Sequence, residues 1–318
     1  MTFAICGELV FPAHNGRPAF RIRRFSEVKI ESSWQSLTDT ADIVLPRKVK
    51  DFDRMKVSEW FREGDPIEIY AGYNGNLSLE FSGYVKQVPA GIPLTITCED
   101  EMYQLKRRAV SVSLEGCSLK ELLQHVAPGY SIVCDDTSLG AVRFPKMSSA
   151  MILEELAKSG IRCWFVGKTL YAFSVSRSDW VDPVKVLLEK TAGESLKQKA
   201  VENTLVIVRL LRKIGKKLTV EYGDKGAGKI ITRELSGVER TIDDLEREAK
   251  RLYERSKIPG LDGDVTLFGL PSLAHGMKIA LRSSIYPEKN GTYRVDAITK
   301  TINSGGYRQK CKLGDKEL

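Results

Sequence analysis

Apolar and polar side chains alternate along much of the first hundred residues, which is the pattern of half-buried β-strands. The runs at 66–70 and 94–99 place apolar side chains at alternate positions. Asn74-Gly75 separates two such runs, and Asn-Gly readily adopts the positive φ angles of a tight hairpin turn. We therefore expect an antiparallel β-barrel domain over residues 1–107.

Residues 108–178 have a mixed pattern, which predicts a small α+β module. Ser118 stands in an N-cap position ahead of a short amphipathic helix that Pro128-Gly129 ends, and a second helix is predicted at about 149–159. Strand-like segments surround these helices, at 130–134, 161–166 and 170–175.

Residues 179–318 return to strands around one helix. Thr241 and Asp244 form a capping-box pattern ahead of an apolar stripe, so a helix is predicted at about 242–257. Further strand-like segments follow at 264–268, 277–281, 291–301 and 306–313. The predicted fold class is α+β, mainly β, with two similar antiparallel β-barrel domains flanking the α+β module.

Two parts of the chain share an order of glycines and strands. The segment Gly64-Asp-Pro-Ile67, followed by Gly83-Tyr-Val85, is echoed by Gly276-Met-Lys-Ile279 followed by Tyr293-Arg-Val295. Such self-similarity indicates a duplicated domain, but short β meanders also resemble one another by chance. Duplication and coincidence both stay open at this point.

Length and charge bound the protein further. A chain of 318 residues has room for about two domains. Lys plus Arg number 49 against 41 acidic residues, a net charge of +8 that permits a polyanionic partner without requiring one. The N-terminus has no basic region ahead of a long apolar run, so we expect synthesis in a cytoplasm without a secretory signal.

Motifs for catalysis and ligand binding are weak. Gly223-Asp-Lys-Gly-Ala-Gly228-Lys229 has the spacing of a phosphate-binding loop, but Ile230 stands where a hydroxyl should hold magnesium, and a strand-like run follows. We interpret it as a glycine-rich hairpin turn. The pair at Asp262 and Asp264 lacks the later ligands of a calcium loop. No catalytic, cofactor-binding or metal-binding residue is predicted, and an enzyme is not expected.

One basic cluster surrounds a turn at Gly215. A hairpin tip with like charges can meet nucleic acid, an acidic partner or solvent, and these alternatives stay open. The cluster consists of Arg209, Arg212, Lys213, Lys216 and Lys217.

Several short motifs occur in a recognisable order. They are Ser33-Trp34-Gln-Ser-Leu37-Thr-Asp-Thr-Ala41-Asp-Ile43-Val-Leu45-Pro46, Gly64-Asp65-Pro, Phe81-Ser-Gly83-Tyr-Val85, Cys98-Glu99-Asp100, Gly269-Leu-Pro271, Gly276, Tyr293-Arg-Val295 and Gly306-Tyr307. In this order they resemble the late control gene D family, the baseplate hub proteins of contractile phage tails and related injection systems.

The resemblance implies a homotrimer whose two barrels per subunit alternate around a ring with a central channel. Such a ring joins a sixfold tail tube to a threefold spike and does no chemistry. The implied partners are the tail tube protein, other baseplate proteins, and DNA or an effector in transient contact with the channel, all within a virion tail baseplate or phage-like injection particle. Because the chain ends at Leu318 without a repetitive needle, we expect a separate spike protein, and we expect no membrane insertion.

Within this interpretation, the basic hairpin at 209–217 reaches a neighbouring subunit or the channel wall. Two other classes of function remain as alternatives. One is a tail-associated cell-wall hydrolase or binding module, which the missing acid/base pattern disfavours. The other is a basic DNA-binding protein, favoured by net charge alone. The sequence leaves open whether the particle is a phage, a domesticated injection device or a non-contractile tail.

Overall fold

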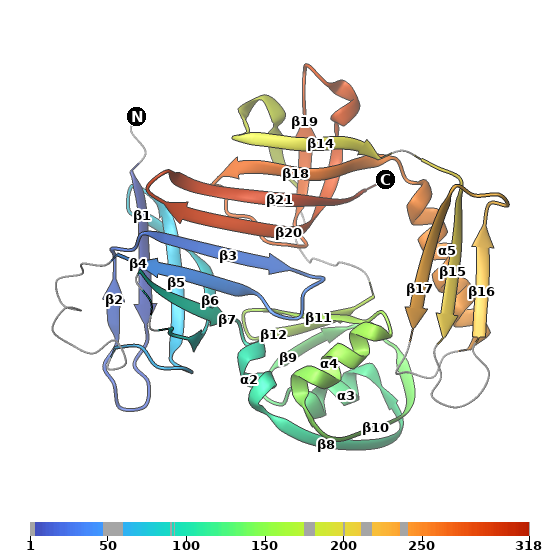
Figure 1. Ribbon diagram of the computed structural model, residues 1–318, viewed down its shortest axis with the longest axis horizontal. Coiled ribbons are helices and arrows are strands. Elements are labelled where there is room, and N and C mark those ends of the chain that lie inside the picture. The colour runs from blue at the N-terminus through green and yellow to red at the C-terminus, as the bar shows by residue number, and fades with distance from the viewer. Residues whose placement is uncertain are drawn as a thin grey trace.

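The computed structural model describes residues 4–46, 60–89, 91, 93–174, 182–199, 201–210, 218–235 and 241–317. Strands dominate, and most of them pair antiparallel, so the predicted α+β, mainly-β class is confirmed (Figure 1). The N-terminal part supplies β1 (Ile5–Phe11), β2 (Phe20–Ile22), β3 (Glu27–Ser33), β4 (Thr40–Leu45), β5 (Pro66–Tyr73), β6 (Asn76–Gln87) and β7 (Leu94–Glu99).

A single large sheet runs through both ends of the chain. Its hydrogen-bonded order is β14-β18-β21-β20-β3-β4-β7-β6-β5-β1-β2, with β19 paired to β20 and β13 paired parallel to β19. The C-terminal strands and two short 3-10 helices are β13 (Val184–Leu187), η1 (Leu188–Lys190), β14 (Gly193–Lys199), β18 (Gly260–Phe268), β19 (Lys278–Arg282), η2 (Pro287–Lys289), β20 (Gly291–Asn303) and β21 (Gly306–Lys316).

The turn between β5 and β6 forms where the sequence predicts it. Asn74 and Gly75 have φ angles of 53° and 84°, as a tight hairpin turn requires. Along β5, Ile67 and Ile69 are buried while the residues between them are partly exposed. The alternation therefore places one face of the sheet in the hydrophobic core.

The α+β module packs below the large sheet in the view of Figure 1. Ser118 caps its first predicted helix, with Glu121 completing a capping box, and Ser148 caps the second. The antiparallel pair β8–β10 and the helix α2 were not predicted. The elements are α2 (Met102–Arg107), β8 (Ala109–Ser118), α3 (Leu119–Val126), β9 (Ser131–Cys134), β10 (Ser138–Ser148), α4 (Ser149–Lys158), β11 (Arg162–Val166) and β12 (Thr169–Phe173).

A third body consists of β15 (Thr204–Leu210), β16 (Leu218–Gly223), β17 (Lys229–Leu235) and the helix α5 (Ile242–Lys257). The predicted helix at 242–257 is confirmed, with Thr241 and Asp244 forming its capping box. Buried side chains of β15 and α5 form a hydrophobic cluster of their own. The predicted boundaries at 107/108 and 178/179 remain a prediction, and we propose that this body is a lobe distinct from the C-terminal strands of the large sheet. We refer to it below as the β15–α5 lobe.

Candidate assembly interface

Two groups of strands in the large sheet have the same order. We call β3, β4, β5, β6 and β7 repeat A, and β14, β18, β19, β20 and β21 repeat B. Repeat A is bonded in the order β3-β4-β7-β6-β5, and repeat B in the order β14-β18-β21-β20-β19. All of these pairs are antiparallel, so each strand of one repeat has a counterpart in the other.

The two repeats also share individual backbone hydrogen bonds. In repeat A, Gly64 N donates to Val85 O at 2.8 Å, and Val85 N donates to the carbonyl of residue 65 at 2.9 Å. In repeat B, Gly276 N donates to Val295 O at 2.7 Å, and Val295 N donates to the carbonyl of residue 277 at 2.9 Å. Both glycines have positive φ angles, +88° and +84°, a conformation that favours glycine at both positions.

A register shift occurs at the same place in both repeats. The β6–β7 ladder shifts between Val85 and Gln87, and the β20–β21 ladder shifts between Val295 and Ala297. A β-bulge bends its strand and alters the local twist, so repeat A and repeat B bend at equivalent points. Agreement in strand order, hydrogen bonds and bulge position favours duplication over coincidence.

Equivalent positions are buried in both cores. The matched pairs, repeat A first, are Ile43 and Val265, Ile67 and Ile279, Ile69 and Leu281, Val85 and Val295, Ile96 and Cys311, and Cys98 and Leu313.

A seven-pair ladder joins repeat A to repeat B. Strand β20 pairs with β3 from Ala297↔Ser33 to Asn303↔Glu27. Along this edge of β20, the residues before the bulge bond β19 and those after it bond β3. The chain therefore contains one complete edge-to-edge contact between two similar units.

A buried ion pair crosses this joint. Lys300 of β20 is paired with Glu80 of β6, and the side chains are 7% and 0% exposed. Ser272 Oγ donates to Glu80 Oε2 at 2.7 Å and accepts from Lys300 Nζ at 2.9 Å. Because charges removed from water require partners, these three residues fix how the repeats meet.

Two tyrosines extend the joint. The rings of Tyr73 and Tyr307 stack with their centroids 6.2 Å apart, and Tyr73 Oη donates to Tyr307 O at 3.2 Å. Gly269 lies against the Tyr307 ring so closely that a Cβ atom there would fall 2.0 Å from it. Tyr307 belongs to the hydrophobic core of repeat A although it lies on β21, so the two cores are interlocked.

One stretch of strand edge in each repeat lacks a strand partner within the described ranges. Strand β14 pairs with β18 alone, and its Lys197 and Gln198 are exposed. On β6, the edge that bonds β5 ends its ladder at Tyr84, leaving Gln87 exposed beyond the bulge. The β14 edge is the counterpart of the β3 edge that bonds β20, and the β6 edge is the counterpart of the β20 edge that bonds β3. A sheet edge with unpaired amides and carbonyls is a template for another strand.

Only the first residue of the basic cluster lies in the described structure. Arg209 is on β15, 47% exposed, with its Nη1 3.9 Å from Glu234 Oε1 on β17. Strands β15 and β16 pair as the antiparallel arms of the predicted hairpin. The other four residues, Arg212, Lys213, Lys216 and Lys217, lie outside the described residues.

The glycine-rich segment at 223–229 is a turn, but the expectation of a hairpin is wrong. Strand β16 lies antiparallel and β17 parallel to β15, so the turn connects the two outer strands across β15. Asp224 accepts hydrogen bonds from Thr204 N at 3.0 Å and from Lys257 Nζ at 2.7 Å. Its carboxylate ties β15 to the end of α5, which is a structural role.

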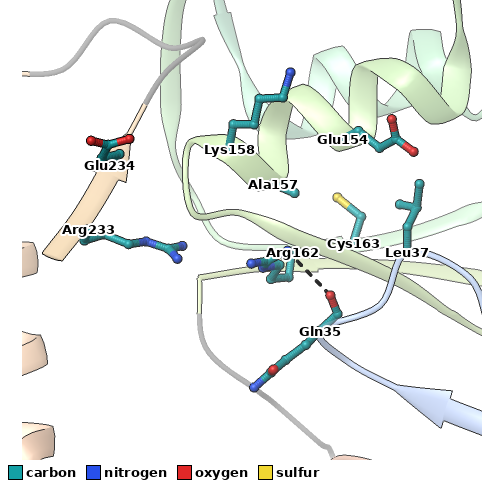
Figure 2. A pocket seen from close by; sticks show the side chains of 9 residues that line it. All are labelled: Gln35, Leu37, Glu154, Ala157, Lys158, Arg162, Cys163, Arg233 and Glu234. Atoms are coloured by element: carbon teal, nitrogen blue, oxygen red, sulfur yellow. Dashed lines mark hydrogen bonds between the residues drawn. The ribbon is translucent and has the colours of Figure 1, made fainter. Parts of the chain in front are cut away.

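A cleft of about 350 Å³ lies between the α+β module, the β3–β4 connection and β17. Figure 2 shows Arg162 and Arg233 extending toward one another across it, with Glu154, Lys158 and Glu234 around them. Arg162 Nη1 lies 3.5 Å from Gln35 O. Ligand pockets are mostly apolar with few polar groups, whereas charges of both signs line this cleft.

The cysteine in the cleft lacks the features of a nucleophile. Burial raises the pKa of the Cys163 thiol to about 12, so the reactive thiolate is not populated near neutral pH. Among the described residues, no group of three or more His, Cys, Asp or Glu side chains is arranged to hold a metal ion. None of the helices in the described ranges has the length and apolar character to cross a membrane.

A buried polar cluster lies where the two repeats meet the module. Asp39 Oδ2 of the β3–β4 connection is 3.8 Å from His275 Nε2, and the Asp39 amide donates to Asp100 Oδ2 at 3.3 Å. Burial raises the pKa of Asp100 to about 7 and also raises the pKa of Asp39, while it lowers the pKa of His275 to about 4. The His275 ring lies edge-on to Trp164 of the module, with centroids 6.1 Å apart.

No family model matches the chain, and no curated protein matches it. Solved structures share its fold. The tail protein from Neisseria meningitidis matches 98% of this chain and 96% of its own, with a TM-score of 0.68 at 13% identity. The 43 kDa tail protein of prophage MuSo2 from Shewanella oneidensis matches 98% of this chain and 100% of its own, with a TM-score of 0.69 at 14% identity.

A third similar structure comes from a secretion system. The E. coli c3393 protein is described as a component of the type VI secretion system with structural similarity to T4 bacteriophage tail proteins gp27 and gp5. It matches 92% of this chain and 74% of its own, with a TM-score of 0.58 at 8% identity. At these identities the likeness is one of fold, so the chain has the fold of this group of tail and secretion-system proteins.

Proposed function

We propose that this protein is a structural tail protein, a baseplate hub that forms a trimeric ring between a sixfold tail tube and a threefold spike. The observation that carries the proposal is the pair of register-matched repeats joined edge to edge by β3 and β20. Three chains would supply six similar units. The shared fold with phage tail and type VI secretion proteins supports the same role.

The arrangement of repeats explains how one ring serves two symmetries. Repeat A and repeat B present similar sheets, so a ring of three chains would offer a nearly sixfold surface to the tube. The α+β module and the β15–α5 lobe each occur once in the described part of the chain, and the surface that they cover would therefore be threefold. Contacts between chains would be heterologous, with one surface meeting a different one, and such contacts close into rings.

The proposed partners are further copies of this chain, the tail tube protein, a spike protein and other baseplate proteins. DNA or an effector would pass transiently through the channel of the assembled virion tail or injection particle. No catalytic step is proposed: charged side chains of both signs line the cleft, and burial raises the pKa of the Cys163 thiol there. We retain Arg209, Arg212, Lys213, Lys216 and Lys217 as a proposed contact with a neighbour or with the channel.

The oligomeric state in solution tests the ring. Light scattering coupled to size exclusion should give a mass of about 107 kDa, three times the 35.6 kDa of one chain. The trimer should then bind the tube protein. A monomer at all concentrations, with no tube binding, would contradict the hub.

The same measurement tests the basic hairpin. We expect a variant with all five cluster residues changed to Glu to lose the trimer mass or binding to the rest of the tail. A variant that assembles and functions normally would remove the hairpin from the interface and the channel.

A further inference from the structure

We infer that the outer edge of β14 in one subunit pairs antiparallel with the end of β6 in the next subunit, in the register that β3 adopts on β20. The inference rests on the proposed ring and names the strands that would close it. Within one chain, β20 of repeat B accepts β3 of repeat A. In the described ranges their counterparts have no strand partner on the matching side: the outer edge of β14, and the edge of β6 beyond its ladder to β5.

The equivalence of β3 and β14 follows from their ladders. Lys29 of β3 faces Asp42 of β4, and Ser195 of β14 faces Asp264 of β18. Asp42 and Asp264 are themselves equivalent, because they face equivalent residues of β7 and β21. Both strands have seven residues, so β14 matches β3 from end to end.

The equivalence of β6 and β20 follows from the shared bulge. Gln87 is the first paired residue after the bulge in repeat A, and Ala297 holds that place in repeat B. On β20, this is the position at which the ladder to β3 begins, with Ala297 opposite Ser33. In the described ranges the same edge has no strand partner from Gln87, the last residue of β6, onward; Gln87 is exposed and Val88 is half-buried.

Transferring the register gives definite residue pairs between subunits. The pair Ala297↔Ser33 becomes Gln87↔Lys199 of the neighbour. The next pair, Ile298↔Ser32, becomes Val88↔Gln198 of the neighbour. Both predicted pairs involve residues of the described structure.

The chemistry of the two edges suits a specific but limited contact. Lys197, Gln198 and Glu194 are exposed on β14, and charged side chains discourage indiscriminate strand addition while leaving the backbone able to pair. Pro89 lies two residues beyond the end of β6 and offers no amide hydrogen, so the ladder would be shorter than the seven pairs inside the chain. The contact between subunits would therefore be weaker than the joint within one subunit.

The mass of the cross-linked product identifies its origin. A disulfide requires Cα atoms within about 7 Å. Covalent dimers and trimers arise only from disulfides between molecules, so they report contacts between subunits.

Cysteine trapping of the full-length chain tests the register. The double variants Gln87→Cys/Lys199→Cys and Val88→Cys/Gln198→Cys should give covalent dimers and trimers after mild oxidation. Neighbouring pairs in an antiparallel ladder alternate between close and wide spacing, so at least one of the two should be efficient. The wild-type protein and the single variants correct for its own six cysteines.

The matched control is Gln87→Cys/Lys197→Cys, which keeps the same sheet face but shifts the register by two residues. It should cross-link at least fivefold less than the better in-register variant. Equal cross-linking of all double variants, or none above the single variants, would overturn the inferred pairing.

The wild-type mass separates the two proposals. If the wild type is a trimer but the in-register variants do not cross-link, the hub proposal stands and the β6–β14 contact is wrong. A monomer whose in-register variants cross-link at high concentration would support the contact and contradict a stable trimer. A monomer without cross-linking would contradict both.

Discussion

Buried ionisable side chains make the junction of the repeats and the module sensitive to pH. Because burial raises the pKa of Asp100 to about 7, the folded protein holds a proton that the unfolded chain releases between about pH 4 and 7, and the raised pKa of Asp39 acts in the same direction. Stability from these carboxyls therefore falls as pH rises through this range. The lowered pKa of His275 acts in the opposite sense, because the unfolded chain binds a proton that the folded protein does not.

The carboxyls and His275 change stability with pH in opposite directions, so removing one contribution should leave the other visible. We expect the melting temperature of His275→Gln to fall more steeply than that of the wild type from pH 4.5 to 7. Asp100→Asn should shift the slope toward higher stability at higher pH. Each proton contributes at most about 1.4 kcal/mol per pH unit. Thermal unfolding across this range measures both slopes.

The control is Asp243→Asn, at an exposed position on α5. Its slope should match that of the wild type. If His275→Gln and Asp100→Asn also keep the wild-type slope, the junction does not titrate as its burial indicates.

Residue signals that act locally were readable from the sequence. Ser118, Thr241 and the Asn74-Gly75 turn each depend on neighbours a few positions away, and the structure confirms all three. The junction was not readable, because Asp39, Asp100 and His275 are brought together by tertiary packing.

At the scale of elements, one glycine allows two strands of repeat A to approach closely. A Cβ atom on Gly83 of β6 would lie 2.1 Å from the backbone oxygen of Glu99 on β7. Backbone cannot move aside as the end of a flexible side chain can, so a side chain here would push β6 and β7 apart.

We expect Gly83→Ala to lower the free energy of unfolding by about 1–3 kcal/mol, the cost of overpacking. Urea unfolding measures the change. Gly193→Ala is the matched control, because an added Cβ on this β14 glycine meets nothing within 4 Å. It should be neutral or slightly stabilising, through the lower entropy of the unfolded chain. Equal effects of the two substitutions would show that β6 and β7 tolerate the separation.

Element prediction succeeded where one face of a strand or helix is buried. The stripe of α5 and the alternation of β5 are strong because each packs one side against a core. Strand β14 was missed, since its sequence GESLKQK carries a single apolar side chain, Leu196, which is too few for an alternating pattern. Strand β8 was also missed, although Val110, Val112 and Leu114 do alternate with serine.

For the whole molecule, the buried pair of Glu80 and Lys300 holds repeat A and repeat B together. Lys300→Met would leave the Glu80 carboxylate buried without its cation. We expect the free energy of unfolding to fall by about 3–5 kcal/mol. The double variant Lys300→Met/Glu80→Leu should recover most of this loss, because two apolar side chains can replace a buried ion pair. Chemical denaturation of the three proteins measures the effect.

An exposed ion pair in the same sheet serves as the control. Lys29 and Glu31 of β3 are each about half exposed, so Lys29→Met should change stability by less than about 1 kcal/mol. A Lys300→Met variant no less stable than Lys29→Met would show that the joint does not depend on its ion pair.

The organisation of the whole molecule was predictable in part. Three strands of each repeat are similar in sequence, because Gly64 and Gly276 have positive φ angles and Val85 and Val295 are buried at equivalent core positions. The first two strands of each repeat gave none, and the ladder between β3 and β20 joins residues too distant for any local pattern to indicate. The separate cluster of the β15–α5 lobe likewise depends on tertiary packing.

The ladder between β3 and β20 also has a consequence for synthesis on the ribosome. Strand β3 ends at Ser33 and β20 ends at Asn303, so about 270 residues must emerge before the joint can close. At roughly 5–20 residues per second, the β3 edge of each nascent chain stays open for about 14–54 seconds. On a polysome several such chains lie close together. The open β3 edge of one nascent chain could there pair with β20 of another chain instead of its own.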